Sequence, residues 1–354
     1  MNTIYQKVSA KAVNAADADA YRTASGILQN GGLVAFPTET VYGLGGDGLR
    51  PDASRKIYAA KGRPSDNPLI IHIADFESLG KLTAEIPKAA YELAERYWPG
   101  PLTMVLPKAE CVPYETTGGL DTVAIRMPNH TVALELIRQS GVCIAAPSAN
   151  TSGRPSPTRA EHVAEDMDGR IDMILDGGEV GIGIESTIVD FTGEVPTILR
   201  PGYINQEMLE EVLGEVRIDP AILEGNQDRN LKPKAPGMKY RHYAPKGQLI
   251  IFEGNENSVV AEINRQAEAY LSEGKIVGII ATEETCVRYP KGIVKIIGNR
   301  GDEVSISRGL YRVLREFDTE GAQVILGESF EGGRLGQAIM NRMLKAAGHH
   351  VVRL

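Results

Sequence analysis

One short loop of the sequence combines two cations with a rigid turn. Lys61 and Arg63 precede the segment PSDNP at 64–68, in which two prolines restrict the backbone and Asp66 and Asn67 favour turn conformations. A stiff loop holds both cations in place, and arginine can bind two phosphate oxygens at once while lysine adds a point charge. These residue types indicate a phosphate site, and two solvated surface cations are the alternative.

Alternation along two expected strands places polar groups on shared faces. In the strand expected at 122–127, Thr122 and Arg126 point to one face and Val123 to the other. In the strand expected at 68–73, His72 lies on one face of an apolar run. His72 is therefore either a core histidine that hydrogen-bonds within the protein or a residue that contacts a ligand. A lone histidine is more often the former, and its nearness to the cationic loop makes the two alternatives equal.

Hydroxyl groups and further cations follow other expected strands. The segment APSANTSGRPSPT at 146–158 places Ser148 and Ser156 after an apolar strand and before a helix start, where backbone donors favour anions. An ordinary serine-rich turn is the alternative. Ser186 precedes a strand and Arg200 ends one. A nucleotide cleft requires positive charge at one place, even on an acidic chain. The chain offers four cations at expected strand or loop ends: Lys61, Arg63, Arg126 and Arg200.

Length and composition limit the class of protein. A chain of 354 residues with 42% apolar and 24% charged residues is typical of a soluble protein of two domains. Its net charge of −8 argues against a chain-wide electrostatic grip on nucleic acid. Cys111, Cys143 and Cys286 form no C-x-x-C pair, so neither a zinc site nor a disulfide framework is indicated. No stretch is long and apolar enough for a membrane span, and we expect a cytoplasmic protein.

The chain alternates expected strands and helices in two regions, as α/β proteins do. Residues 14–213 are expected to form a mixed, twisted sheet with helices, and 248–354 a smaller, doubly wound, Rossmann-like α/β domain. Residues 214–247 lack apolar periodicity and are expected to be a linker. The expected strands of the first region lie at 31–37, 68–73, 102–107, 122–127, 142–147, 172–178, 186–192 and 196–202.

Several common nucleotide and catalytic motifs are missing. The sequence contains no G-x-x-x-x-G-K-[ST], G-x-S-x-G or H-E-x-x-H pattern. GLGGDG at 43–48 matches G-x-G-x-x-G, but it does not follow an expected strand, and we interpret the match as accidental. The residues alone therefore indicate a phosphate-binding cleft of some other type.

Six segments in order resemble the YrdC-type threonylcarbamoyl-AMP synthases in their long, two-domain form. They are FPTETVYGLG, KGRPSDNPLIIHI, TVAIRMP, APSANTSGRPSPT, ESTIVD and LRPG, and PGMKYRHYAP follows in the linker. The resemblance implies a YrdC-like first domain and an enzyme that makes L-threonylcarbamoyl-adenylate and pyrophosphate from L-threonine, bicarbonate or CO₂, and ATP with Mg²⁺. It also implies hand-over of the product to a tRNA threonylcarbamoyl transferase, for N6-threonylcarbamoyladenosine modification of tRNA.

The resemblance also implies roles for particular residues. Lys61 and Arg63 are expected to be catalytic through the phosphates, and no protein ligand to a metal is implied. Both are expected to lie outside the core. L-Threonine is expected to contact Thr40, His72, Arg126, the Ala146 backbone and Ser186. ATP is expected to contact Lys61, Arg63, Asn67, Thr122, Ser148, Ser156 and Arg200.

The linker and the alternatives complete the expectations. Tyr240, His242 and Tyr243 stand together in a chain that is only 6% aromatic, and we expect them to fold over the cleft as a lid; a linker merely attached to the surface is the alternative. A tRNA- or double-stranded-RNA-binding module without ATP turnover is the main competing function. A second alternative is a carbamoyl-transfer domain of hydrogenase maturation, but such proteins carry C-x-x-C pairs that this chain lacks. A third is a structural adaptor, and the ordered run of polar motifs argues against it. Direct tRNA binding stays open.

Overall fold

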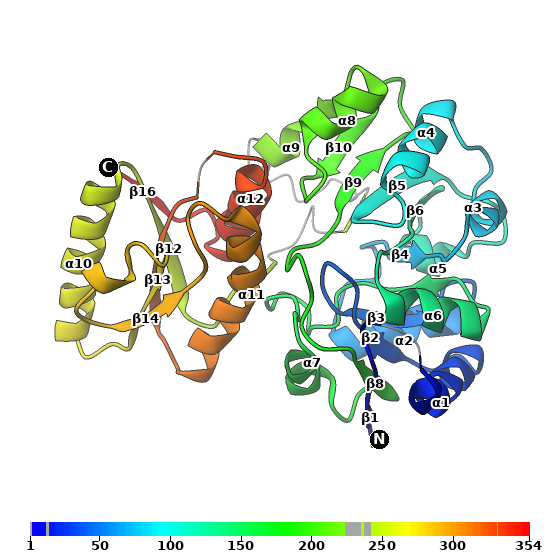
Figure 1. Cartoon of the computed structure of the whole chain (residues 1–354), viewed down its shortest axis with the longest axis horizontal. Coiled ribbons are helices and arrows are strands. Elements are labelled where there is room, and N and C mark those ends of the chain that lie inside the picture. The colour runs from blue at the N-terminus through cyan, green and yellow to red at the C-terminus, as the bar shows by residue number, and fades with distance from the viewer. Residues whose placement is uncertain (1, 12–13, 224–234, 237–241, 331) are drawn as a thin grey trace. The chain divides into compact units, whose positions relative to one another are not determined.

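The computed structural model describes residues 2–11, 14–223, 235–236, 242–330 and 332–354, and their contacts divide the chain into two units (Figure 1). The first unit comprises Met1–Ser152, Pro157–Gly181 and Glu185–Tyr240. The second comprises Arg241–Leu354 and two short segments from the first half of the chain, Gly153–Ser156 and Ile182–Ile184.

The first unit is built on a mixed sheet of eleven strands in the order β1-β8-β2-β3-β7-β4-β6-β5-β9-β10-β11. The sheet contains both parallel pairs, such as β4 with β6, and antiparallel pairs, such as β5 with β6, so the expected mixed sheet is confirmed. The strands are β1 (Ile4–Lys7), β2 (Val34–Phe36), β3 (Gly43–Asp47), β4 (Ile70–His72), β5 (Leu102–Pro107), β6 (Thr122–Arg126), β7 (Ile144–Ala145), β8 (Met173–Asp176), β9 (Thr187–Asp190), β10 (Thr197–Arg200) and β11 (Arg217–Ile218).

Helices with recognisable start and stop signals connect these strands. His130 caps the start of α6 by accepting a hydrogen bond from Val132 N, and Gly141 ends it in the left-handed conformation. Pro51 begins α2, where its missing N–H costs nothing. The helices are α1 (Ala18–Gln29), α2 (Pro51–Lys61), α3 (Phe76–Leu82), α4 (Lys88–Tyr97), α5 (Tyr114–Thr117), α6 (Thr131–Ser140), α7 (Ala160–Met167), α8 (Gln206–Leu213) and α9 (Pro220–Leu223), with a 3₁₀ turn at Ala15–Asp17.

The two faces of the sheet bury separate apolar clusters. Val34, Phe36 and Ile144 pack on one face against α1 and α6, which contribute residues such as Leu28 and Leu136. Neighbours of opposite parity, such as Ala35, Ala145, Ile71 and Ile125, pack on the other face against α2, α4 and α7. Burying both faces removes much apolar surface from water, which is the main favourable term in folding.

The first face continues beyond α1 and α6. There Ile70, Ala124, Val105 and Ile188 form a small buried cluster with Ala235 of the linker. His72 and Arg126 lie two residues beyond Ile70 and Ala124 on their strands and therefore share this face. This region holds most of the polar groups described below.

Strand β3 is a run of glycines that the sequence analysis did not identify as a strand. A Cβ at Gly45 would lie 2.7 Å from Ile144 Cγ2 and 2.8 Å from Phe36 Cε1. Larger residues are therefore excluded by close packing between β2, β3 and β7. Gly43–Asp47 forms a strand rather than a phosphate-binding turn, in agreement with the interpretation of the G-x-G-x-x-G match as accidental.

The second unit contains a five-stranded sheet in the order β14-β13-β15-β12-β16, and every pair in it is parallel. Helix α10 packs on one face with Ile250 and Ile279, while Phe317 of α11 and Met343 of α12 lie against Gly278 and Gly327 on the other. Figure 1 shows α10 apart from α11 and α12, with the strands between them. The expected doubly wound domain is confirmed. Its elements are β12 (Gln248–Glu253), α10 (Glu256–Ser272), β13 (Val277–Ala281), a 3₁₀ turn (Cys286–Arg288), β14 (Ile293–Ile296), α11 (Glu303–Thr319), β15 (Val324–Glu328), α12 (Gly336–Ala346) and β16 (Val351–Arg353).

One detail goes beyond the expectations. The segment 214–247, expected to be a linker, begins with β11, which pairs with β10, and with α9, which follows it. Across the described residues, we find no helix with the length and apolar character that a bilayer crossing needs.

Candidate active site

A row of residues across the sheet brings together side chains that are far apart in the sequence. His72 of β4 pairs with Arg126 of β6, and Thr103 of β5 pairs with Ile188 of β9, which in turn pairs with Arg200 of β10. Thr103 stands beside Arg126, because Met104 pairs with Ile125 in the antiparallel register. Paired positions share a face, so these side chains line one side of the sheet.

Arg126 is held on three sides. Its Nε donates to Gly100 O at 3.3 Å, and its Nη1 donates to Thr40 Oγ1 at 2.9 Å. Its Nη2 lies 2.7 Å from Oε1 of Glu39. The side chain of Arg126 is only 4% exposed, so the guanidinium is fixed in orientation as well as position. The sequence analysis predicted Arg126 and Thr40 but missed Glu39.

The proton order next to Arg126 is determined. Thr38 donates its hydroxyl proton to Val41 O at 2.7 Å, so it accepts in its 2.9 Å contact with Thr40. Thr40 therefore donates to Thr38 and accepts from Arg126. The Thr40 oxygen is left with one lone pair, on a side chain that is fully buried.

His72 is buried and neutral. Its Nδ1 lies 3.2 Å from the carbonyl oxygen of Ile70, which can only accept, so Nδ1 carries the proton and Nε2 has a lone pair. Burial, and then the positive charge of Arg126, lowers the pKa of His72 to about 3. A neutral imidazole can accept a hydrogen bond from a substrate without adding charge.

We expect this buried imidazole to make the protein acid-labile. Below pH 6.5 an unfolded chain binds a proton at His72 and the folded one does not, so stability falls by about 1.4 kcal/mol per pH unit until about pH 3. His72→Asn keeps an N–H donor but does not titrate. Urea unfolding at pH 7 and pH 4.5 should show the wild type losing about 2–3 kcal/mol more than the variant. Equal losses would contradict a buried, neutral His72.

The phosphate loop differs from its expectation in one respect. Lys61 is not a solvent-facing cation: it is 1% exposed, and its Nζ donates to the carbonyl oxygens of Ser148 and Asn150. The expectation that Lys61 lies outside the core is wrong, because the end of α2 turns its side chain under the loop after β7. Arg63 is half-buried, and its Nη2 donates to Asn67 O at 3.3 Å and Pro68 O at 3.1 Å.

Other residues expected at the ATP site lie at the same level of the sheet. Asn67 precedes β4, Thr122 begins β6, and Ser148 follows β7 and bridges to Gly43 of β3. The register of β4 with β6 and β7 places all three toward the end of the sheet opposite to His72 and Arg126. Thr122 and Arg126 are four residues apart, or about 13 Å along the strand. No described residue hydrogen-bonds to the buried Oδ1 of Asn67.

Ser186 and Arg200 are joined directly. Arg200 donates from Nε to Ser186 O at 3.0 Å and from Nη2 to Ser186 Oγ at 3.1 Å, and Thr103 Oγ1 lies 2.7 Å from the same hydroxyl. Arg200 Nη1 also reaches the linker at Pro236 O, 3.5 Å away. The sequence analysis expected Ser186 with threonine and Arg200 with ATP; the structure makes them neighbours. Thr103 was missed, although alternation along its strand places it on the face of Val105.

Two further positions expected in the site are buried. The Ala146 N–H donates to Ile70 O at 2.8 Å, so this donor is already used within the sheet. Ser156 is fully buried and belongs to the second unit through the segment Gly153–Ser156.

The expected lid is only partly described. Tyr240 lies outside the described residues. His242 and Tyr243 belong to the second unit, where the Tyr243 ring stacks on Tyr311 of α11 with centroids 5.2 Å apart. Tyr243 is 6% exposed, so its ring packs within that unit. A lid role for these residues stays a prediction.

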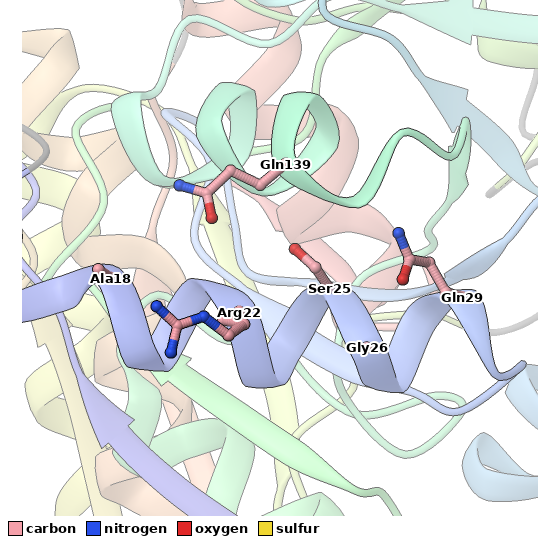
Figure 2. A pocket seen from close by; sticks show the side chains of 6 residues that line it. All are labelled: Ala18, Arg22, Ser25, Gly26, Gln29 and Gln139. Atoms are coloured by element: carbon pink, nitrogen blue, oxygen red, sulfur yellow. The ribbon is translucent and has the colours of Figure 1, made fainter.

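A separate surface pocket lies between α1 and α6 (Figure 2). It has a volume of about 400 Å³ and is lined by Ala18, Arg22, Ser25, Gly26, Gln29 and Gln139. None of the expected site residues lines this pocket, and the Nε2 of Gln29 already donates a hydrogen bond to Ser140 O at 2.8 Å. The polar row on the sheet is therefore the candidate active site.

Comparisons with known proteins agree along the chain. A family model described as "Telomere recombination" matches residues 26–202, and one described as "Threonylcarbamoyl-AMP synthase, C-terminal domain" matches residues 204–348. Threonylcarbamoyl-AMP synthase of Pyrococcus abyssi is 51% identical over 94% of this chain and 95% of its own. That of Bacillus subtilis is 50% identical over 93% of each chain.

Solved structures agree with the sequence relatives. The crystal structure of Pyrococcus abyssi Sua5 in complex with L-threonine matches with a TM-score of 0.93 and 49% identity, over 99% of this chain and 100% of that one. The resemblance expected from the six sequence segments is confirmed. The chain belongs to the two-domain, Sua5-type family of threonylcarbamoyl-AMP synthases.

Proposed function

We propose that this enzyme converts L-threonine, bicarbonate or CO₂, and ATP into L-threonylcarbamoyl-adenylate and pyrophosphate. The observation that carries the proposal is the pairing of Arg126 with His72 on one face of the sheet, with Asn67, Thr122 and Ser148 toward its opposite end. One end offers an amino-acid anchor and the other offers phosphate and nucleotide contacts, so a single face could hold two substrates side by side.

Threonine would bind at the Arg126 end. The fixed guanidinium suits a carboxylate, because charge-assisted hydrogen bonds are the strong ones. Neutral His72 offers a lone pair at Nε2, and Thr40 offers one at its hydroxyl. The Ala146 carbonyl and Ser186 complete the expected set. The crystal structure of the Pyrococcus abyssi relative with L-threonine supports this choice of amino acid.

ATP would bind toward the other end of the sheet face. Two loop carbonyls hold the Arg63 guanidinium, a group that can bind phosphate oxygens through charge-assisted hydrogen bonds. Lys61 contributes through its buried charge beside Ser148 and by fixing that loop. The buried Oδ1 of Asn67 accepts no hydrogen bond from a described residue, and a donor on the nucleotide would supply one. Thr122 and Ser148 are further expected ATP contacts at this end, and Ser156 is another expected contact. Arg200 lies level with Arg126 in the sheet, so ATP would have to extend toward that end to contact it.

The chemistry requires alignment rather than a protein nucleophile. The threonine ammonium group gives up a proton, and the resulting amine adds to CO₂ and loses a second proton to form a carbamate. A carbamate oxygen then attacks the α-phosphorus of ATP as the bond from that phosphorus to pyrophosphate breaks. The protein lowers the barrier by holding two mutually repelling anions together and by stabilising charge on the pyrophosphate. Among the described residues no group of three His, Cys, Asp or Glu side chains could hold a metal ion. Mg²⁺ would enter on the phosphates of ATP and neutralise part of their charge.

Tyr240, His242 and Tyr243 would shield the water-labile adenylate from hydrolysis, and the product would pass to a tRNA threonylcarbamoyl transferase in the cytoplasm. Deleting this segment should raise abortive AMP release. An unchanged yield and lifetime of the adenylate would count against the lid.

The test is pyrophosphate release with one component omitted at a time. Purified protein is incubated with ATP, Mg²⁺, labelled bicarbonate and threonine, and pyrophosphate should appear only in the complete mixture, together with a labelled adenylate. Pyrophosphate release without threonine, or none in the complete mixture, would overturn the proposal. Salt-sensitive tRNA binding in a gel shift without ATP turnover would favour the RNA-binding alternative instead.

A further inference from the structure

Glu39 is a buried carboxylate to which no role has yet been given. Its side chain is 12% exposed and lies beside Arg126, with Oε1 2.7 Å from Nη2. The contact joins opposite charges without the alignment of a hydrogen bond. Among the described residues, neither carboxylate oxygen of Glu39 has a hydrogen-bond donor.

This arrangement is unusual for a purely structural ion pair. A buried carboxylate is costly unless its oxygens accept hydrogen bonds, and a carboxylate that only orients an arginine is best served by aligned N–H groups. Arg126 instead directs its aligned bonds to Thr40 and Gly100. Glu39 supplies negative charge and unfilled acceptor positions at the site where the amino acid would bind.

An α-amino acid has the complementary pattern. Its carboxylate and its ammonium group are attached to the same carbon, so it needs a cation and an anion a few ångströms apart. Arg126 and Glu39 provide that pair, and an ammonium group brings three N–H donors for carboxylate oxygens that lack them. His72 is neutral and cannot supply the negative charge.

We propose that Glu39 receives the α-ammonium group of the substrate while Arg126 holds its carboxylate, so that the two residues together select an α-amino acid. The inference rests on the proposed threonine site. A structural role would have a different signature, because loosening Arg126 weakens every ligand that carries a carboxylate, whether or not it carries an ammonium group.

The experiment compares two ligands by calorimetry. One is L-threonine and the other is its 2-hydroxy analogue, 2,3-dihydroxybutanoate of the same configuration, in which a hydroxyl replaces the ammonium group. The wild type should bind threonine about 10- to 100-fold more tightly, as expected for a charged hydrogen bond. E39Q should lose most of this preference by weakening threonine alone, with the analogue changed less than about threefold.

Matched variants make the outcome decisive. Glu115→Gln removes a surface carboxylate that also lies 2.7 Å from an arginine, Arg55, and should leave both affinities unchanged. E39D keeps the charge and should keep the preference, which also covers the case in which E39Q does not fold. Equal weakening of both ligands in E39Q, complete loss of preference in E39D, or no preference in the wild type would each overturn the inference. A wild type that binds neither ligand would instead remove the threonine site on which it rests.

Discussion

Arg126→Gln is expected to lower kcat/KM for threonine about 100- to 1,000-fold and to destabilise the fold. The variant loses the proposed carboxylate anchor, and it leaves the buried Glu39 without its cation. Breaking a buried pair by removing one partner costs about 3–5 kcal/mol. Pyrophosphate release at varied threonine gives the first effect, and urea unfolding gives the second.

The double variant E39Q/R126Q separates these two effects. It removes both charges, so part of the lost stability should return while activity stays low. A double variant as unstable as R126Q would show that Glu39 and Arg126 are not coupled. Near wild-type activity in either variant would show that Arg126 does not anchor the substrate.

Arg63→Ala is expected to lower kcat/KM for ATP about 100- to 1,000-fold with stability unchanged within about 1 kcal/mol. Arg63 is half-buried and its Nη2 donates to the carbonyls of Asn67 and Pro68, so its loss removes the proposed phosphate contact and little of the core. Lys61→Ala should lower the same kinetic constant and also destabilise the protein by about 2–4 kcal/mol. It leaves the carbonyls of Ser148 and Asn150 without their donor.

Arg55→Ala is the matched control for these two variants. Arg55 is a surface cation of the same helix as Lys61 and pairs with Glu115, so both kinetics and stability should stay unchanged. Wild-type kinetics for ATP in R63A would remove Arg63 from the site. A Lys61→Ala variant as stable as the wild type would contradict the buried position of that side chain.

Much of the fold was predictable because its signals are local. Alternation in 68–73 and 122–127 placed His72 and Arg126 on defined faces, and the parallel register of β4 with β6 then made them neighbours. The α/β alternation likewise predicted the fold class of both units. The order of the eleven strands was not predictable, because neighbours such as β3 and β7 are separated by many residues and their pairing depends on packing of the whole sheet.

The missed residues depend on contacts that are distant in sequence. Lys61 looks like a surface cation at a helix end, but its side chain is buried and donates to the carbonyls of Ser148 and Asn150, which are distant in sequence. Glu39 lies in the segment FPTETVYGLG, which carries part of the family resemblance. Its proposed role depends on its contact with Arg126, which is far along the chain. The nearest sequence signal was a single carboxylate directly before Thr40, which was itself expected to contact threonine.

The glycines of β3 bear on how mutational scans of this enzyme should be understood. Gly45 touches Phe36 and Ile144 so closely that alanine has no room, yet Gly45 has no side chain that could meet a substrate. A scan would therefore score Gly45 as intolerant alongside Arg126. The two kinds of intolerance differ in cause: one reports the spacing of neighbouring backbones, and the other reports a charge.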